Sequence, residues 1–401
     1  MFMKKLNRKD YCLSCEHILS ERGYVFVQEK PIQGFPVSDN AIYCKNCGQK
    51  INPELESVAS DVNIFLTALS NPKIKVIAFI APSVRAGIGE VFDVKKDCQH
   101  KIVTALKKLG VHAVFSMNFG ADLTIMEESK EFAKRLASRQ NLPLLTSCCP
   151  AWVNYLEKMQ PELLPHLSSC KSPQQMMGAI INSYYAEQEK VLSTELFVVS
   201  IVPCLAKKLE RIKSGVNTRV GYDVDAAITT KELAGIIKNN KIDFAGLEDS
   251  DFDRLFKDYS GSGAGFGISG GVSEAVVNNL FENITYTTTK KDGYTQKIAH
   301  TDKGNIYIAQ VQGVTNANKL FEQIKAHKCK YHLVEVMACE GGCIGGPGQP
   351  SHNNLVWRKN VLKTARKNNK TQRAKDNPII KKLYKDYLTP QKACDLLHVK
   401  K

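Results

Sequence analysis

Apolar and polar positions along the chain follow two alternating periods. From about residue 73 onward, short apolar runs typical of buried strands alternate with stretches in which apolar residues recur every three or four positions, as in amphipathic helices. The predicted strands span 75–80, 111–117, 142–147, 196–204 and 331–339, and the predicted helices include 95–110 and 122–140. A glycine-rich turn at 261–271 opens a further helix. This order predicts an α/β fold.

The first fifty residues lack this pattern and carry two C-x-x-C pairs, Cys12 with Cys15 and Cys44 with Cys47. Two such hooks are typical of a four-thiolate metal site, and so short a segment has too few apolar residues to fold around a core without one. We therefore expect a small metal-binding segment at 1–60 and a main domain at 70–401. The centre in the small segment is a 4Fe–4S cluster, a mononuclear iron or a zinc ion; the spacing leaves these alternatives open.

Five further cysteines stand directly after predicted strands or close to one. Cys148 and Cys149 follow one strand, Cys204 ends another, and Cys339 ends a third and precedes Cys343 by four positions. In α/β proteins ligands bind beyond the carboxyl ends of strands, so these residues are expected to converge. Four cysteines suffice for a 4Fe–4S cluster or a zinc ion, which leaves one over. The many glycines between 341 and 348 would let the backbone approach a bulky group.

The composition and charge limit the compartment and the partners that we expect for the protein. The chain has 401 residues, 13 cysteines and a net charge of +15, with no long apolar run and no signal-peptide pattern. We expect a soluble, cytoplasmic protein whose cysteines bind metal, with no membrane span. The basic excess lies in a predicted basic helical region at 358–401, mainly in 358–375, without interleaved aromatic residues. A solvated helix or a docking face for an acidic partner explains it better than nucleic-acid binding.

Three segments then point to a family. TSCCPAW (146–152), PCLAKKLE (203–210) and EVMACEGGCIGGPGQP (335–350) resemble, in order, the three signature segments of iron-only (FeFe) hydrogenases. The resemblance runs from about residue 70 to the end and includes the closing LYKDYL and LLH. It implies an H-cluster domain of two α/β lobes with the cluster between them. It also implies an oxidoreductase that catalyses the reversible reduction of protons to dihydrogen.

The resemblance assigns the site residues position by position. Cys149, Cys204, Cys339 and Cys343 match the ligands of the 4Fe–4S half of the H-cluster, and Cys343 would bridge to a diiron unit carrying CO, cyanide and a dithiolate. Lys207 matches a cyanide-binding lysine. The other positions that match contacts to the diiron unit are Ala81, Pro82, Ser83, Pro173, Gln174, Val202 and Met337.

The surplus Cys148 matches the inner thiol of a proton relay that continues through Glu128, Ser168, Glu131 and Arg135. Glu128, Glu131 and Arg135 are spaced i, i+3 and i+7, which places them on one stripe of the predicted helix. The same stripe is also typical of an exposed salt-bridge face.

The chain departs from the family where Val202 and Ser273 replace methionines and where Pro347 replaces a glycine. Two alternatives to a catalytic hydrogenase therefore stay open. One is a hydrogen-sensing regulatory hydrogenase, and the other is an iron–sulfur assembly protein of the same fold without the diiron unit. The implied partners are ferredoxin or a similar electron carrier and the maturation enzymes that build the diiron unit.

Overall fold

The computed structural model describes residues 24–27, 41–44, 61–218, 221–351 and 354–400. Near the N-terminus, strands β1 (Tyr24–Val27) and β2 (Ala41–Cys44) pair antiparallel. Cys12, Cys15 and Cys47 lie outside the described residues, and of Cys44 only the backbone is described. The N-terminal metal centre therefore stays a prediction.

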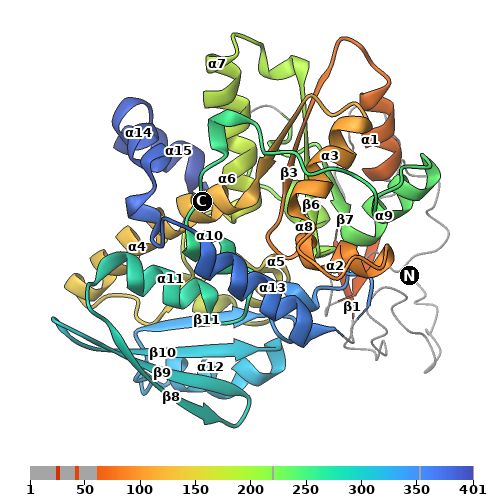
Figure 1. Cartoon of the computed structure of the whole chain (residues 1–401). Coiled ribbons are helices and arrows are strands. Elements are labelled where there is room, and N and C mark those ends of the chain that lie inside the picture. The colour runs from red at the N-terminus through yellow and green to blue at the C-terminus, as the bar shows by residue number, and fades with distance from the viewer. Residues whose placement is uncertain (1–23, 28–40, 45–60, 219–220, 352–353, 401) are drawn as a thin grey trace, which may run out of the picture.

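The first of two larger sheets has four parallel strands in the order β4-β3-β6-β7. Their bounds are β3 Lys75–Ile80, β4 Ala113–Ser116, β6 Leu196–Val202 and β7 Ala226–Thr229. Helices α1 (Asp61–Leu69), α3 (Gln99–Lys108) and α9 (Thr230–Asn239) lie to one side and α6 (Pro173–Ile180) to the other (Figure 1). The near-continuous apolar sequences of β3 and β6 follow from this two-sided burial.

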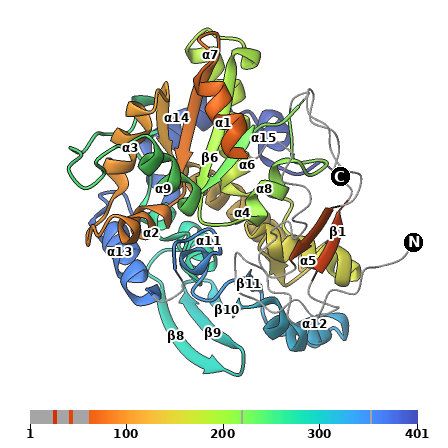
Figure 2. The same ribbon diagram turned by 90° about the vertical axis from the view of Figure 1, so that its right-hand side faces the viewer.

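The second sheet has five strands in the order β5-β11-β10-β9-β8. Its bounds are β5 Leu144–Leu145, β8 Thr285–Lys291, β9 Tyr294–Thr301, β10 Gly304–Gln312 and β11 Leu333–Met337. β5, β11 and β10 run parallel, whereas β9 and β8 pair antiparallel and extend away from the body of the molecule (Figure 2).

Side chains alternate along β11 between two cores, as the pleat requires. Val334 and Val336 pack with α5 (Pro150–Met159) and α12 (Asn318–Lys325), where Trp152 stacks on Phe321. Leu333 packs on the opposite face with residues of α4 (Met117–Ser138) and α11 (Gly271–Leu280). Both faces of the sheet are therefore covered by helices at β11.

The long helix α4 begins directly after β4 and packs against elements of both sheets. The Ser116 side chain caps it by accepting a hydrogen bond from the Asn118 amide. It therefore begins at Met117, five residues before the predicted start at 122. Gly120 lets α4 approach α6 closely, since a Cβ there would lie 2.5 Å from the Pro173 carbonyl oxygen.

The basic C-terminal region folds as α13 (Leu355–Asn368), α14 (Pro378–Asp386) and α15 (Pro390–Leu397). Arg358 is fully buried and pairs with Glu90, and Arg366 pairs with Glu274. The expectation of a solvated helix is therefore wrong for these arginines, because the chain supplies their acidic partners.

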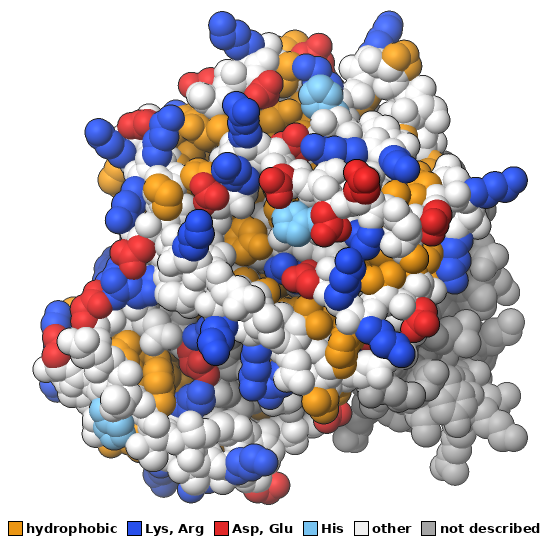
Figure 3. Space-filling model, in the orientation of Figure 1, with side chains coloured by type: hydrophobic (Ala, Val, Ile, Leu, Met, Phe, Trp, Pro, Cys, Tyr) orange, Lys and Arg blue, Asp and Glu red, His pale blue; other side chains and the backbone are white. Residues whose placement is uncertain are grey.

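On the face shown in Figure 3, Lys and Arg side chains are interspersed with Asp and Glu. Among the described residues, no helix combines the length and apolar content that crossing a bilayer requires.

Candidate functional site

The loops that carry the cysteines extend from both larger sheets and lie close to one another. Cys148 and Cys149 follow β5 and Cys204 follows β6, while Cys343 opens a 3-10 turn at Cys343–Gly345. Cys343 lies within electrostatic range of Cys149 and Cys204, and Cys148 within range of Cys149 and Cys343. Cys339 follows β11, and its carbonyl accepts a hydrogen bond from the Gly342 amide. The structure thus brings together thiols that are far apart in sequence.

The surroundings of these thiols oppose their ionisation. Cys148 is buried, and Cys149, Cys204, Cys339 and Cys343 are partly buried. Burial raises the pKa of Cys343 to about 12 and that of Cys204 to about 11, and the neighbouring cysteines add to both effects. The pKa of Cys148 is raised well above its usual value for the same reasons. Metal ions are the usual means of ionising such thiols, so the donor set fits a bound cationic centre.

Among the described residues, no group of three or more His, Cys, Asp or Glu side chains is arranged to hold a single metal ion.

Glycines let the three loops pack backbone to backbone. A Cβ at Gly346 would lie 2.3 Å from the Pro203 carbonyl oxygen, and one at Gly342 would lie 2.6 Å from the Ser269 amide nitrogen. The Gly348 amide also donates to the Pro203 carbonyl at 2.8 Å. The glycines thus serve contact between loops, in addition to any room that they leave for a bound group.

Lys207 supplies a fixed positive charge beside the thiols. Its Nζ atom, on α8 (Ala206–Arg211), donates to the Cys148 carbonyl at 3.2 Å and to the Glu210 carboxylate at 2.8 Å. Burial opposes the charge, but Glu210 outweighs this and raises the pKa of Lys207. The lysine is therefore charged and held in place.

The loop after β3 carries Ala81, Pro82 and Ser83 to the same region. A Cβ at Gly267 would lie 3.7 Å from the Cβ atoms of both Ser83 and Cys343, so these two residues flank that glycine. The Ser83 hydroxyl is buried without a hydrogen-bond partner. An unpartnered buried hydroxyl at this place fits a site that binds a polar group.

The glutamines at the start of α6 differ in their contacts. Both polar atoms of the Gln174 side chain are hydrogen-bonded. The amide nitrogen donates to the Lys207 carbonyl and to Glu210, and the amide oxygen accepts from Ser200. Gln175, which the sequence analysis did not single out, is buried with neither polar side-chain atom bonded. Pro173 opens the helix, and Val202 and Met337 are buried at the ends of β6 and β11.

The carboxylates of α4 lie in the interior rather than on a surface. Glu128 is completely buried, and neither of its oxygens has a hydrogen bond within 3.5 Å. Burial raises its pKa to about 8, and repulsion from Glu131 adds to this, while Ser168 and the Ser147 amide oppose it. Glu128 is thus mainly protonated at neutral pH, within electrostatic range of Cys148. The exposed salt-bridge interpretation is wrong for this residue.

Glu131 lies one turn further along α4 than Glu128 and is slightly exposed. Its Oε2 atom accepts hydrogen bonds from the Ser168 hydroxyl at 2.9 Å and the Ser169 amide at 3.0 Å, and its Oε1 atom accepts from Arg135 at 2.6 Å. The side chains of Glu131 and Arg135 are only 15% and 13% exposed. Glu128, Glu131 and Arg135 therefore follow one another along α4, and Ser168 bonds Glu131 from the loop before α6.

Ser273 belongs to a buried polar network. Its hydroxyl donates to Glu335 at 2.9 Å and accepts from Gln310 at 3.0 Å. Burial raises the pKa of Glu335 to about 6, although amides of Ser273 and Gly270 oppose the shift. The serine is therefore integrated into its surroundings by hydrogen bonds that a methionine could not make.

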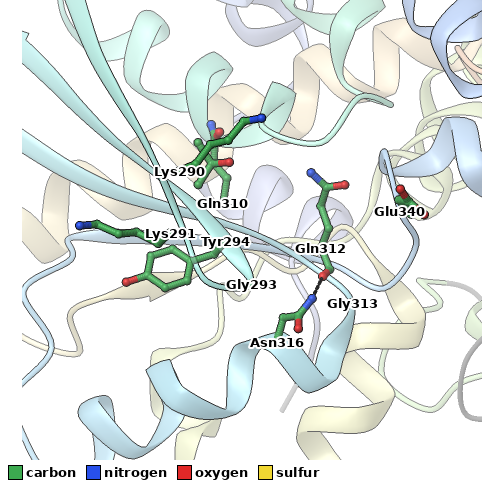
Figure 4. Close-up of a pocket in the computed structure, with 10 residues that line it drawn as sticks. Lys290, Lys291, Gly293, Tyr294, Gln310, Gln312, Gly313, Asn316 and Glu340 are labelled. Atoms are coloured by element: carbon green, nitrogen blue, oxygen red, sulfur yellow. Dashed lines mark hydrogen bonds between the residues drawn. The ribbon is translucent and has the colours of Figure 1, made fainter.

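A separate cavity of about 470 Å³ lies on the second sheet, next to Glu340. Figure 4 shows Lys291 and Tyr294 on one side of it and Glu340 on the other. It contains none of the site residues expected from the sequence.

Comparison with known proteins places this site in a family. Residues 74–347 match the family model described as iron only hydrogenase large subunit, C-terminal domain. The chain belongs to this family.

Individual relatives include hydrogenases and assembly proteins. The chain is 39% identical over 382 residues to the NADP-reducing hydrogenase subunit HndD of Solidesulfovibrio fructosivorans, covering 88% of this chain and 65% of that one. It is 38% identical over 355 residues to iron hydrogenase 1 of Clostridium pasteurianum, covering 83% and 62%. It is also 30% identical over 353 residues to cytosolic iron-sulfur assembly component 3 of Rattus norvegicus, covering 80% and 73%. The chain thus spans less than two thirds of the first two relatives.

A solved structure of a variant of FeFe-hydrogenase HydA1 from Chlamydomonas reinhardtii has a TM-score of 0.74 and 32% identity to this chain. The match covers 85% of this chain and 98% of the solved chain. The α/β fold with two sheets is therefore that of a known FeFe hydrogenase.

Proposed function

We propose that this chain is an FeFe hydrogenase that interconverts protons, electrons and dihydrogen at an H-cluster. The observation that carries the proposal is a set of proton-carrying groups beside the thiols: Cys148 lies within electrostatic range of Glu128, and the Ser168 hydroxyl bonds Glu131. Glu128 and Glu131 follow one another on α4, so the proposed proton line runs outward along this helix. A protein that turns over protons at a buried centre needs such a path, whereas one that only stores or transfers a cluster does not.

The residues present fit the implied cofactor. Cys149, Cys204, Cys339 and Cys343 would hold the 4Fe–4S half, with Cys343 as the bridge to the diiron unit. The diiron side would face Lys207, Ser83 and the start of α6. When bound, the cluster supplies the electrons and the iron centre at which protons and dihydrogen interconvert.

The protein's own groups have distinct tasks. Lys207 presents a charge that suits anionic ligands such as cyanide. Cys148, with a raised pKa, carries a proton at neutral pH and so can donate one. Glu128 can receive or return it because its pKa of about 8 is near the working range.

A second candidate is an iron–sulfur assembly factor of the same fold, favoured by the 30% identity to cytosolic iron-sulfur assembly component 3. Such a protein needs the four-cysteine cluster but neither a proton line nor a cation beside a diiron unit. A hydrogen sensor is the third candidate, because Val202 and Ser273 change the surroundings of the centre.

We also propose partners and a cellular compartment for this protein. A ferredoxin or similar carrier would deliver electrons, and maturation enzymes would build the diiron unit. The protein would work in the cytoplasm. The four N-terminal cysteines would hold a second centre, which passes electrons onward if it contains iron and is structural if it contains zinc.

Turnover of the matured chain tests the proposal. The chain is produced with maturation enzymes under anaerobic conditions, and dihydrogen formed from reduced methyl viologen is measured by gas chromatography. Cys343→Ser is the matched control, because it removes the bridging thiol. We expect steady dihydrogen formation by the wild type and none by the variant. A wild type that contains iron but forms no dihydrogen under these conditions would favour the assembly or sensing alternative.

A further inference from the structure

Arg135 is too firmly bonded to pass protons to solvent. Its guanidinium donates to Glu131 and to the carbonyl oxygens of Asn141, His166 and Leu167 at 2.6 to 3.0 Å. An arginine side chain keeps its proton throughout the pH range in which proteins fold. Arg135 therefore positions Glu131, and the outer end of the proton line must lie elsewhere.

A second set of contacts leads from Glu131 to the C-terminal segment. The Ser169 hydroxyl lies 3.2 Å from Glu131 Oε2 and 2.9 Å from Nδ1 of His398. The other ring nitrogen of His398, Nε2, lies 3.0 Å from the Glu127 carboxylate. An unbroken hydrogen-bonded path therefore connects Glu131, Ser169 and His398.

Backbone pairing fixes this geometry. Cys170 and His398 form an antiparallel β-bridge, and the Val399 amide donates to the Ser169 carbonyl at 2.8 Å. The C-terminal segment is thus attached to the loop that carries Ser168 and Ser169. The imidazole is held beside the serine by the main chain as well as by its side-chain contacts.

A carboxylate that stays ionised lies beside the His398 imidazole. Burial opposes ionisation of Glu127, but hydrogen bonds from His398, Lys130 and Tyr384 lower its pKa to about 2. Glu127 is therefore a permanent acceptor that orients the ring. The other titratable groups on this side are Glu131 on α4 and the buried thiol of Cys170. The His398 side chain is 19% exposed, which gives it access to solvent.

We propose that His398 is the solvent end of the proton relay, reached from Glu131 through Ser169. The inference rests on the proposed function and deepens it. An imidazole has a ring nitrogen that can accept a proton and another that can donate one, whereas a guanidinium has no acceptor atom.

The transfer balances as a hydrogen-bond relay. The Nδ1–H bond of protonated His398 breaks as its proton passes to the Ser169 oxygen, and the Ser169 O–H proton passes to the Glu131 carboxylate. His398 becomes neutral, Ser169 is unchanged and Glu131 becomes a carboxylic acid. Nδ1 of His398 regains a proton from hydronium or a protonated buffer in solvent, which becomes water or the buffer base, and Glu131 passes its proton inward through Ser168 toward Glu128. The same steps run in reverse when dihydrogen is oxidised.

Two substitutions of His398 separate a relay role from a structural one. In the matured enzyme, His398→Gln keeps hydrogen-bonding capacity but carries no proton, so we expect turnover to fall roughly tenfold or more. His398→Ala should fall similarly and recover severalfold when imidazole is added. Cys394→Ala, at an exposed position on the same C-terminal helix, is the matched control and should neither slow nor respond to imidazole. Infrared bands of the cluster should be the same in all variants.

A measurement independent of turnover uses the full chain with ¹⁵N-labelled histidine, expressed without maturation enzymes. We expect Ser169→Ala to move the Nδ1 resonance of His398, and Glu127→Gln to move the Nε2 resonance. Unchanged resonances in both variants would overturn the assigned contacts.

The outcomes distinguish this proposal from the proposed function. Full wild-type turnover in His398→Gln, or a loss in His398→Ala that imidazole does not reverse, would overturn the His398 exit and leave the hydrogenase assignment intact. A wild type without turnover would contradict the hydrogenase function, and with it the relay.

Discussion

The Ser168 hydroxyl donates a hydrogen bond of 2.9 Å to the Glu131 carboxylate across 37 positions of sequence. This bond connects α4 to the loop that precedes α6. One turn further along α4 toward the thiols, Glu128 is buried without a hydrogen bond and lies within electrostatic range of Cys148. The positions of these four groups give the proposed function its most specific support.

The role of Cys148 is open to a direct test. We expect Cys148→Ala to leave the iron content and the cluster's infrared bands unchanged while turnover falls by about two orders of magnitude. The reason is that four other cysteines suffice for the cubane, whereas the relay loses its inner acid. Metal analysis, infrared spectra and dihydrogen formation check this on one preparation. Loss of the 4Fe–4S half in this variant would make Cys148 a ligand instead.

Glu128 should make stability depend on pH. Its folded pKa of about 8 exceeds the usual value of 4.5, so between about pH 5 and 8 the folded state keeps a proton that the unfolded chain has lost. The stabilisation is complete below the unfolded pKa and is lost as pH rises through that window. Glu128→Gln removes this contribution.

Urea unfolding of both proteins at several pH values measures the effect. The free energy of unfolding of the wild type should fall relative to that of Glu128→Gln by up to about 1.4 kcal/mol per pH unit across the window. Parallel stability curves would mean that Glu128 ionises normally in the folded protein. Glu128→Gln should also slow turnover, because an amide cannot carry the proton.

Ser273 and Val202 should respond differently to methionine. Ser273→Met removes a hydroxyl that bonds Glu335 and inserts a larger side chain at a fully buried position, so we expect a loss of about 1–3 kcal/mol in unfolding free energy. Ser273→Ala, the matched control, should lose less because it adds no volume. A stable Ser273→Met protein would show that the Glu335 network tolerates repacking.

At Val202 the substitution tests the surroundings of the diiron unit. Methionine adds a polarizable side chain at the end of β6, and we expect Val202→Met to move the CO and cyanide infrared bands or the turnover rate. If neither changes, valine at this position is neutral and the sensing alternative loses support.

The N-terminal cysteines should bind a centre of their own. We expect replacement of Cys12, Cys15, Cys44 and Cys47 by serine in the full chain to remove metal without affecting the cluster held by Cys149 and Cys204. Metal analysis after anaerobic, iron-replete expression then distinguishes iron from zinc, and stoichiometric zinc would exclude an electron-relay role. Unchanged metal content would show that these four residues bind none.

Sequence patterns located the elements that place the site. The apolar runs ending near Ile80 and Val202 match β3 and β6, because strands buried on both faces must be apolar throughout. The five-stranded sheet was only partly foreseen. β8 is exposed along most of its length and rich in threonine and lysine, so its sequence has too few apolar residues to reveal a strand, and the turn at Gly293 was the available signal.

The burial of the proposed proton line could not be predicted from the sequence. The helix period alone places Glu128 and Glu131 on one stripe, but it cannot say whether that stripe faces solvent or the interior. The contact between His398 and Ser169 was missed, because it depends on the C-terminal segment pairing with a loop more than 200 residues earlier. No local pattern encodes such a pairing.

Infrared spectroscopy of the anaerobically matured protein tests the central claim most directly. An H-cluster held by these cysteines predicts bands of iron-bound CO and cyanide, which ordinary protein groups and 4Fe–4S clusters lack. The bands should be absent from the same chain expressed without maturation enzymes and from Cys343→Ser. If competent maturation yields the 4Fe–4S half without any CO or cyanide bands, the chain carries no diiron unit and is not a hydrogenase.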